Sequence, residues 1–427
     1  MKALIHADSY DYHEYRPDSY ILYDHCIREV GPMSAFPGAD QVIDCRNALV
    51  MPGLIVGHAH LYSALVRGLR LPFNPSGFRE LLEQLWWRFD RGIDGEIAYH
   101  SARVFGLEHL KAGVTTIIDH HAGGAAIGGS LDQLKRGLCD ELGLRGIFCF
   151  ETSDRFGADA CIAENLEFAR KERSDRCAGM FGMHASMSLS EATLAKIAAV
   201  LGDLPVHVHV AESAEDEADS LSRYGKRVVR RLHDHGLLSP NSLLAHCVHI
   251  DEAEAALIAE DRCVVALNPT SNMNNAVGLP DLPLLQQYEI PVIIGTDSLG
   301  ANLTRDYLNL LFGMHLKTGS TWRFSYDDLL RCIRQVYEYA GTLLGIKLGR
   351  IEPGYAADLL AVSYQAPTPL NAENIFGHMV TGVFDRFQPR EVWCRGELKL
   401  QNYETVWDEA ALYAEARQAA VKLWGRI

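Results

Sequence analysis

From Met51 onward, short apolar runs alternate with longer amphipathic stretches, and this alternation constrains the fold more than any other feature of the chain. The pattern is typical of βα units that build a parallel sheet. We predict strands over residues 53–58, 114–119, 145–151, 179–184, 205–211, 242–248, 263–268 and 291–297. Eight such runs in about 250 residues predict an α/β fold with a TIM-type (β/α)8 barrel.

The two ends of the chain carry strand patterns of a different kind. Residues 1–50 consist of short alternating segments, and strand character returns within residues 349–402 after the turn Gly-Arg-Ile-Glu-Pro-Gly at 349–354. Neither part has enough apolar surface to fold alone, so we expect both to form one small composite β-sandwich domain. The barrel then covers residues 51–348, and residues 403–427 form a C-terminal helix.

The composition limits the classes of partner. Forty Lys and Arg against 55 Asp and Glu give a net charge of −15. Such a chain repels nucleic acids and anionic membranes, so we expect neither as a partner, whereas a small neutral or cationic substrate fits. A homo-oligomer is compatible with the sequence.

The compartment is predicted from three absences in the sequence. The N-terminus turns polar too early for a signal peptide, and no run approaches the ~18 apolar residues of a membrane span. The 10 cysteines are scattered without a C-x-x-C pair. This usage is typical of reduced, mostly buried thiols, and we expect a cytoplasmic protein.

Two histidines, His58 and His60, end the first predicted strand of the barrel. Since side chains alternate along a strand, positions 58 and 60 share a face. Both imidazoles can therefore point into the barrel and bind one ion. The pair alone is equally compatible with two histidines that are merely packed or exposed.

Further candidate ligands end other strands. His207 and His209 share a face of the strand at 205–211, and spacing alone does not choose between them. We favour His209, because it lies nearer the carboxyl end, where barrel active sites are built. Asp297 closes the strand at 291–297, and a buried carboxylate there needs a metal, a cation or a hydrogen-bond donor. Together with His246, these strand-end residues predict a metal site.

Several motifs make the chain resemble the amidohydrolase superfamily, in the branch of metal-dependent deaminases and triazine chlorohydrolases. They are Pro-Gly-Leu-Ile before His58-x-His60, His209-x-x-Glu212, 245–249, Asn-Pro-Thr-Ser-Asn at 268–272, Gly-Thr-Asp at 295–297, and the tail 349–359. More narrowly, segments 120–122, 151–155 and 268–275 are similar to aminohydrolases of the SsnA type.

The resemblance implies one divalent metal, zinc before iron, on His58, His60, His209 and Asp297. Two-metal relatives bridge their ions with a carboxylated lysine from strand four, and the strand at 179–184 has no lysine, so we expect a mononuclear site.

The resemblance also implies the catalytic roles. The metal lowers the pKa of a bound water toward ~7 and so provides hydroxide. Asp297 ligates the metal and accepts the proton of that water. Glu212 carries a proton to the ring nitrogen of the substrate and then to the leaving group, which favours a partly desolvated carboxyl. His246 hydrogen-bonds the hydroxide or the developing oxyanion.

Substrate contacts are expected from strand-end residues around the metal. His184 ends strand four, and Arg155 follows strand three together with Glu151. Only one of His120 and His121 can point inward, and we assign His121, because it lies nearer the mouth. Arg155 is equally compatible with a loop salt bridge.

A helical stretch around Trp86 and Trp87 is long enough to cover the barrel mouth. The two indoles could stack on a flat ring, although large aromatics more often fill a core.

The sequence is compatible with three functions. The first is hydrolytic deamination of an amino-substituted N-heterocycle, such as a purine or pyrimidine. The second keeps the metal but hydrolyses a ring C–N bond or displaces another leaving group from a heteroaromatic ring. The third is a catalytically silent metal-binding protein, which the complete set of ligands and the acid Glu212 disfavours.

Overall fold

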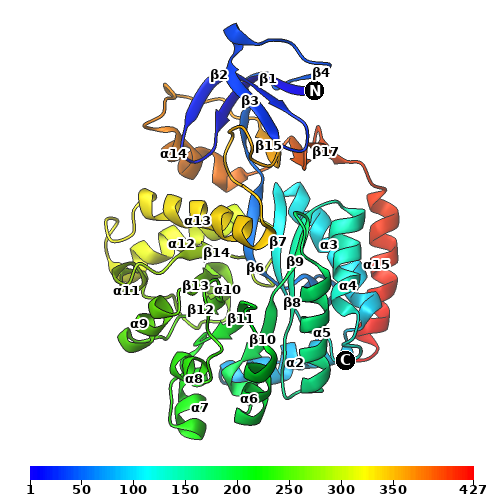
Figure 1. The fold of residues 1–427 in the computed structure, drawn as a ribbon, viewed down its shortest axis with the longest axis vertical. Helices are drawn as coiled ribbons and strands as arrows, with labels where there is room; N and C mark the ends of the chain where they lie inside the picture. Colours follow the sequence, from blue (N-terminus) through cyan, green and yellow to red (C-terminus); the bar gives the residue numbers. More distant parts are fainter.

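Two parallel sheets form the centre of the larger part of the molecule in a computed structural model that describes residues 1–427 (Figure 1). One has the order β6-β7-β8-β9 and the other the order β10-β11-β12-β13-β14. Their bounds are β6 (Leu54–Ala59), β7 (Val114–His121), β8 (Arg145–Phe150), β9 (Cys177–Gly179), β10 (Phe181–Ala185), β11 (Val206–Val210), β12 (Leu243–His246), β13 (Val264–Leu267) and β14 (Val292–Ile294). Strands therefore lie at all eight predicted positions, and the α/β class with parallel strands is confirmed.

Isolated bridges connect the two sheets at both edges. Ala59, the last residue of β6, pairs in parallel with Asp297, which follows β14. Thr152, which follows β8, pairs in parallel with Met183 of β10. Both bridges lie at the carboxyl ends of the strands, so the residues that end β6, β8, β10 and β14 meet on one side of the molecule.

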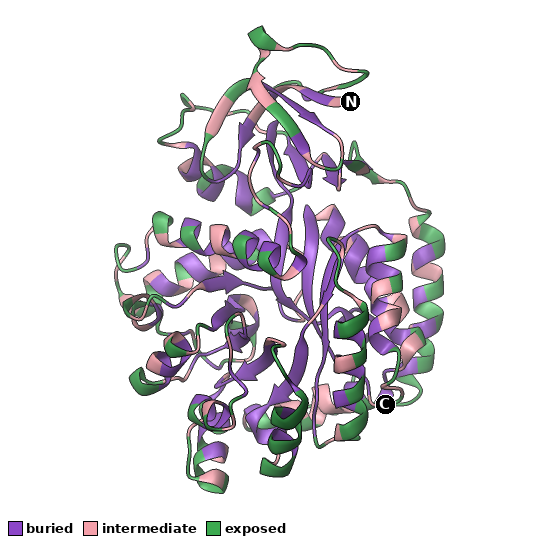
Figure 2. Ribbon diagram, viewed as in Figure 1, coloured by how far each residue is buried: buried purple, intermediate pink, exposed green.

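Helices cover the outer faces of these strands (Figure 1). Almost every residue of the central strands is buried, because both faces of a parallel sheet are covered (Figure 2). The helices are α1 (Phe78–Leu81), α2 (Trp87–Gly92), α3 (Gly95–Lys111), α4 (Ser130–Lys135), α5 (Ala158–Lys171), α6 (Glu191–Val200), α7 (Ala214–Tyr224), α8 (Val228–Asp234), α9 (Glu252–Glu260), α10 (Pro269–Asn274), α11 (Leu282–Gln287), α12 (Leu303–Thr318), α13 (Tyr326–Leu344), α14 (Ile375–His378) and α15 (Glu409–Trp424).

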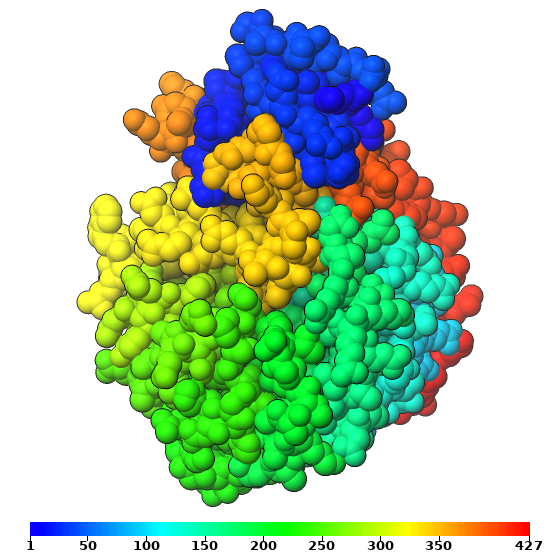
Figure 3. All heavy atoms as spheres, in the orientation of Figure 1, coloured from blue at the N-terminus to red at the C-terminus, as the bar shows by residue number.

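The third sheet combines strands from residues 2–52 with strands from residues 359–405, and these two segments lie together in one lobe (Figure 3). Its order is β18-β17-β16-β15-β5-β1-β2-β3, and β4 pairs with β1. Leu4 and Val50 share one apolar cluster with Leu359 and Trp393, so each end covers the other. The bounds are β1 (Lys2–Tyr10), β2 (Tyr15–Tyr23), β3 (Ile27–Pro32), β4 (Gln41–Asp44), β5 (Leu49–Pro52), β15 (Leu359–Val362), β16 (Glu391–Cys394), β17 (Glu397–Gln401) and β18 (Glu404–Thr405).

A continuous helical segment, residues 78–92, lies at the end of the molecule away from this third sheet (Figure 1). It consists of α1, a π-helical turn over Leu82–Trp86, and α2, and we call it the cover segment. The residues that directly follow the C-terminal helix α15 bind the far end of the cover segment. Arg426 donates to the carbonyl of Gly92 at 2.9 Å, and Arg88 donates to the carbonyl of Ile427 at 2.9 Å.

The cysteines agree with the expectation of buried thiols. All 10 are free, and every one except Cys26 is buried. Among the helices, none combines the length and the apolarity that crossing a bilayer requires.

Candidate metal centre and active site

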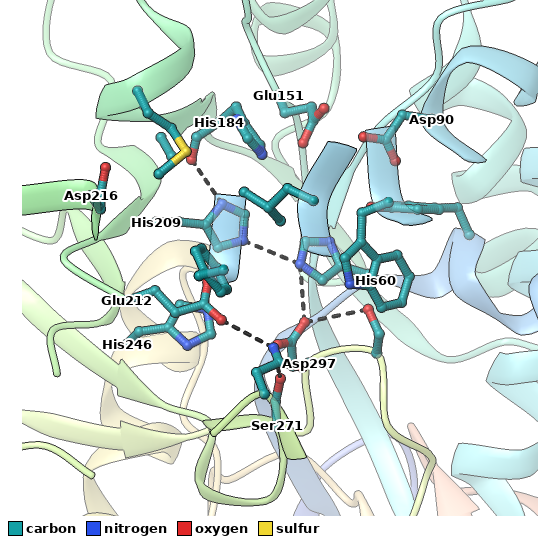
Figure 4. Close-up of a pocket in the computed structure, with 18 residues that line it drawn as sticks. His60, Asp90, Glu151, His184, His209, Glu212, Asp216, His246, Ser271 and Asp297 are labelled. Atoms are coloured by element: carbon teal, nitrogen blue, oxygen red, sulfur yellow. Dashed lines mark hydrogen bonds and ion pairs between the residues drawn. The ribbon is translucent and has the colours of Figure 1, made fainter. Parts of the chain in front are cut away.

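Four side chains, those of His58, His60, His209 and Asp297, converge at the carboxyl ends of β6, β11 and β14, and Figure 4 shows the last three of them. His60 Nε2 lies 3.2 Å from Asp297 Oδ1 and 3.2 Å from His209 Nε2. His58 Nε2 lies 4.0 Å from Asp297 Oδ1. The ligand atoms of His58, His60 and His209 all lie within 4.8 Å of one another. The four residues predicted as metal ligands are therefore brought together.

The protonation of these imidazoles follows from what lies behind them. His60 Nδ1 is 2.6 Å from the carbonyl of His120, and His209 Nδ1 is 2.8 Å from the carbonyl of His184. Since a carbonyl only accepts, each Nδ1 carries the hydrogen and each Nε2 presents a lone pair. Burial, followed by the charges of neighbouring histidines, lowers the pKa of His209 well below its usual value, so its neutral form is favoured.

This arrangement fits a divalent metal. Two lone pairs face each other at 3.2 Å across His60 and His209, and His58 Nε2 is buried without any hydrogen-bond partner. Such an arrangement is repulsive unless a cation lies between the atoms. Three imidazole nitrogens and one carboxylate oxygen are a donor set that zinc and similar ions accept.

His207 lies behind His58 and not beside the converging atoms. Its Nε2 is 2.8 Å from His58 Nδ1, and its Nδ1 is 3.5 Å from Cys149 Sγ. Burial lowers the pKa of His207 to about 3, so it stays neutral. Neutral His207 can accept the Nδ1 hydrogen of His58, which turns the Nε2 lone pair of His58 toward Asp297.

Glu212 and His246 face each other above this cluster. His246 Nε2 lies 3.5 Å from Glu212 Oε2, and His246 Nδ1 lies 2.8 Å from Asn272 Oδ1. The amide of Asn275 donates to Glu212 Oε1 at 3.3 Å. Burial is the largest influence on Glu212 and raises the pKa of its carboxyl, which therefore retains a proton more readily.

Three of the strand ends have unusual backbone conformations. Ala211 after β11, His246 at the end of β12 and Asp297 after β14 have φ of 47°, 75° and 54°. Non-glycine residues rarely adopt positive φ, and such strain is found most often at functional sites. Here the turns direct Glu212, His246 and Asp297 into one cavity.

The space in that cavity is about 660 Å³, a volume that includes the open solvent at its mouth. The cover segment contributes Phe78, Leu82 and Trp86, which are four residues apart and so share one helical face. Five carboxylic acids and no lysine or arginine line it. The lining consists of His60, Tyr62, Phe78, Leu82, Trp86, Asp90, Glu151, His184, Ala185, Met187, His209, Glu212, Asp216, His246, Ser271, Asn275, Asp297 and Ser298.

Of the predicted substrate contacts, His184 lines the cavity, whereas His121 and Arg155 do not. His184 Nδ1 is 2.6 Å from Ser188 Oγ. Trp87 does not line the cavity, and its ring lies edge-on to His184 at 6.3 Å.

The orientation of the histidine pair on β7 is the reverse of the expected one. The ring of His120 lies 4.5 Å from that of His209, and its Nε2 is 3.0 Å from the carbonyl of Met183. His121 instead packs against Tyr62 and Phe150. Because β7 continues to residue 121, alternation turns His120 inward, and nearness to the mouth was the wrong criterion.

Arg155 lies behind the wall, between two acids. Its Nη1 is 2.7 Å from Asp90 Oδ2, and its Nη2 pairs with Glu151. This is the salt-bridge alternative considered for Arg155. Sequence reasoning missed Asp90 and Tyr62 as lining residues, because neither ends a predicted strand. Asn275 also lines the cavity, and the motif at residues 268–275 was the sequence signal that could have identified it.

A protein-family model described as the Amidohydrolase family matches residues 49–399. A 5-methylthioadenosine/S-adenosylhomocysteine deaminase of Syntrophomonas wolfei is 28% identical, over 95% of this chain and 94% of its own. A 5'-deoxyadenosine deaminase of Methanococcus vannielii is 26% identical, over 90% of each chain.

Solved structures show a similar fold. An adenosine deaminase from Xanthomonas campestris with bound zinc has a TM-score of 0.84 at 24% identity, over 99% of this chain and 98% of that one. Atrazine chlorohydrolase TrzN from Arthrobacter aurescens, complexed with zinc, has a TM-score of 0.81 at 22% identity, over 99% of this chain and 100% of that one.

Proposed function

Because the chain belongs to the amidohydrolase family, as its motifs indicated, we propose that it is a metal-dependent enzyme that removes an amino group from a heterocyclic ring by hydrolysis. The observation that carries the proposal is the convergence of unprotonated imidazole nitrogens on Asp297, with the acid Glu212 beside them. Since relatives over nearly the whole chain are named as deaminases of adenosine derivatives, the first substrate class to test is an adenosine-type nucleoside.

His58, His60, His209 and Asp297 would hold one divalent metal, for which zinc is the first choice. Two structural neighbours were crystallised with zinc, and the donor set suits this ion. A bound divalent metal lowers the pKa of a coordinated water toward ~7 and so supplies a nucleophile at neutral pH.

Glu212 would move the proton during deamination. Its raised pKa favours the protonated carboxyl, which would donate this proton to the ring nitrogen beside the amino-bearing carbon. The carboxylate left behind would take up the protons that the attacking water releases, pass one to the leaving amine and keep the other. His246 Nε2 lies 3.5 Å from Glu212 Oε2, and His246 Nδ1 lies 2.8 Å from Asn272 Oδ1. In this position His246 would hydrogen-bond the developing oxyanion.

We infer that the two parallel sheets form one eight-stranded barrel over residues 51–348. The parallel bridges at both edges support closure, and only Met180 separates β9 from β10, which makes them one strand position. Residues 1–50 and 349–402 would then form the small β domain, and residues 403–427 the C-terminal helix. The cavity would lie at the carboxyl ends of the strands, where barrel enzymes place their chemistry.

The test is ammonia release by the zinc-loaded protein. The panel contains 5'-deoxyadenosine, 5'-methylthioadenosine, S-adenosylhomocysteine, adenosine, guanine and cytosine. We expect release from at least one of them, and silence across the panel would contradict the proposal. Product mass separates the alternatives, because deamination exchanges an amino group for a hydroxyl, whereas ring opening adds a whole water.

A matched pair of variants tests the proton carrier. Glu212→Gln should keep its zinc and lower kcat by about 10²–10⁴-fold, the usual contribution of a general acid. Glu260→Gln changes an exposed glutamate of α9 and should leave kcat unchanged. Equal kcat in the two variants would exclude the role of Glu212.

A further inference from the structure

One wall of the cavity contains a buried cluster of two acids and one base, Asp90, Glu151 and Arg155. Asp90 comes from α2, and Glu151 and Arg155 follow β8. Arg155 Nη1 binds Asp90 Oδ2 at 2.7 Å, and Arg155 Nη2 binds Glu151 Oε1. The side chains of both acids are only 2% exposed, and that of Arg155 is 10% exposed.

The cluster lacks one positive charge. Two carboxylates share a single guanidinium, and besides Arg155 the Asp90 carboxyl has the Tyr62 hydroxyl as a neighbouring donor, while its Oδ1 is buried without a hydrogen bond of good geometry. The other faces of Arg155 are covered by the rings of Trp87 and Phe156, at 5.1 and 4.9 Å. A buried carboxylate with an unfilled acceptor is costly, so either a proton or a cationic ligand must complete the set.

The two acids of the cluster, Asp90 and Glu151, line the cavity (Figure 4), whereas Arg155 does not. No lysine or arginine lines the cavity to supply the missing charge, whereas Glu212, Asp216 and Asp297 add further carboxylates. A ligand group that is complementary to this wall is cationic and has N–H donors.

We propose that Asp90 and Glu151 form a subsite for a positively charged, N–H-donating group of the substrate, such as an amine, an amidine or a guanidinium. The group would donate to the carboxylates of Asp90 and Glu151, while the heterocyclic ring lies at the candidate metal ligands. This inference rests on the proposed function only for the position of the ring. The cluster would then select substrates that carry a positive charge at this position.

Binding of a matched pair of probes tests the subsite independently of turnover. Benzylguanidine and benzylurea have similar shapes, but only the first is charged. Isothermal titration with the zinc-loaded protein should show benzylguanidine binding at least about 10-fold more tightly, as expected for charge-assisted hydrogen bonds. Equal affinities would mean that the cluster holds a proton and takes no cation, which would overturn the proposal.

Two variants assign the preference to the cluster. Asp90→Asn should reduce the preference for benzylguanidine to less than about 3-fold. Asp216→Asn removes another cavity carboxylate outside the cluster and should keep the preference. If Asp216→Asn lost it equally, the general negative charge of the cavity would be responsible and not the subsite. Glu151→Gln replaces Asp90→Asn if the latter fails to fold.

Turnover provides a second arm. The kcat/KM for 5'-amino-5'-deoxyadenosine should exceed that for 5'-deoxyadenosine by about 10-fold, and Asp90→Asn should remove the difference. If neither compound releases ammonia but benzylguanidine still binds preferentially, the proposed deamination of adenosines fails while the subsite stands. If both react equally and the two benzyl probes bind equally, the subsite fails while the deaminase stands.

Discussion

The orientation of the candidate metal ligands is set by the groups that contact their second ring nitrogen. The backbone carbonyls of His120 and His184 fix the Nδ1 hydrogens of His60 and His209, and His207 does the same for His58. The convergence of His58, His60 and His209 could be predicted, because strand periodicity places alternate residues on one face and depth separates His209 from His207. The partners behind them could not, since they depend on which strands become neighbours.

His207 offers a test of this support. His207→Phe leaves the Nδ1 hydrogen of His58 without an acceptor, and loss of such a partner commonly weakens metal binding by about 10–100-fold. Zinc affinity, measured by competition with a chromophoric chelator, should fall by that amount. His109→Phe replaces another fully buried histidine, on α3, with no link to the site, and should bind zinc as the wild type does. Equal zinc affinity in both variants would show that His207 does not support metal binding by His58.

Asp119 provides a pH-dependent prediction. Its Oδ1 accepts the amide hydrogen of Leu61 at 2.6 Å, its Oδ2 has no partner, and burial raises the pKa of its carboxyl to about 8. The folded protein therefore keeps a proton there that the unfolded chain loses near pH 4. This group consequently lowers the stability of the wild type as pH rises from about 4 to 8.

Asp119→Asn imitates the protonated acid and lacks this titration. The difference in the free energy of unfolding, variant minus wild type, should rise between pH 5 and pH 8 and then level off. Urea unfolding of both zinc-loaded proteins at matched pH values measures it. A difference that stays constant with pH would mean that Asp119 is ionised in the fold.

At the scale of elements, the cover segment shows what a sequence pattern conveys and what it omits. The helical stretch around Trp86 was visible, and Trp86 does line the cavity. Its attachment was not visible, because the two acceptors at its start come from α7. The amides of Phe78 and Arg79 donate to the two carboxylate oxygens of Glu215, at 2.8 and 3.0 Å. A Cβ at Gly77 would lie 2.2 Å from Glu215 Oε1, so a larger residue there would displace this carboxylate.

Removing this cap should loosen the cover segment alone. Glu215→Ala leaves two amides at the start of the helix without acceptors, which costs about 1 kcal/mol. Hydrogen exchange in residues 78–92 should accelerate about 5-fold, with the rest of the chain unchanged. Asp251→Ala removes a comparable cap from α9 and should accelerate exchange only there. Unchanged exchange in the cover segment after Glu215→Ala would show that other contacts hold it.

At the scale of the whole molecule, segments distant in sequence meet at both ends. The third sheet combines strands from residues 2–52 and 359–405, and α15 reaches back to the cover segment. The sequence predicted that residues 1–50 and 349–402 associate, since neither segment could bury its apolar residues alone. It did not predict the charged cluster of Asp90, Glu151 and Arg155, because its members come from α2 and from the loop after β8, and only their spatial meeting makes a site.

The central claim is that one divalent metal is held by His58, His60, His209 and Asp297. Elemental analysis of the protein after zinc loading and gel filtration tests it most directly, with His60→Ala measured in parallel. We predict one zinc per chain in the wild type and less than about a tenth of that in the variant, because three donors no longer surround the ion. A wild type without tightly bound metal, or a variant that retains its zinc, would contradict the account.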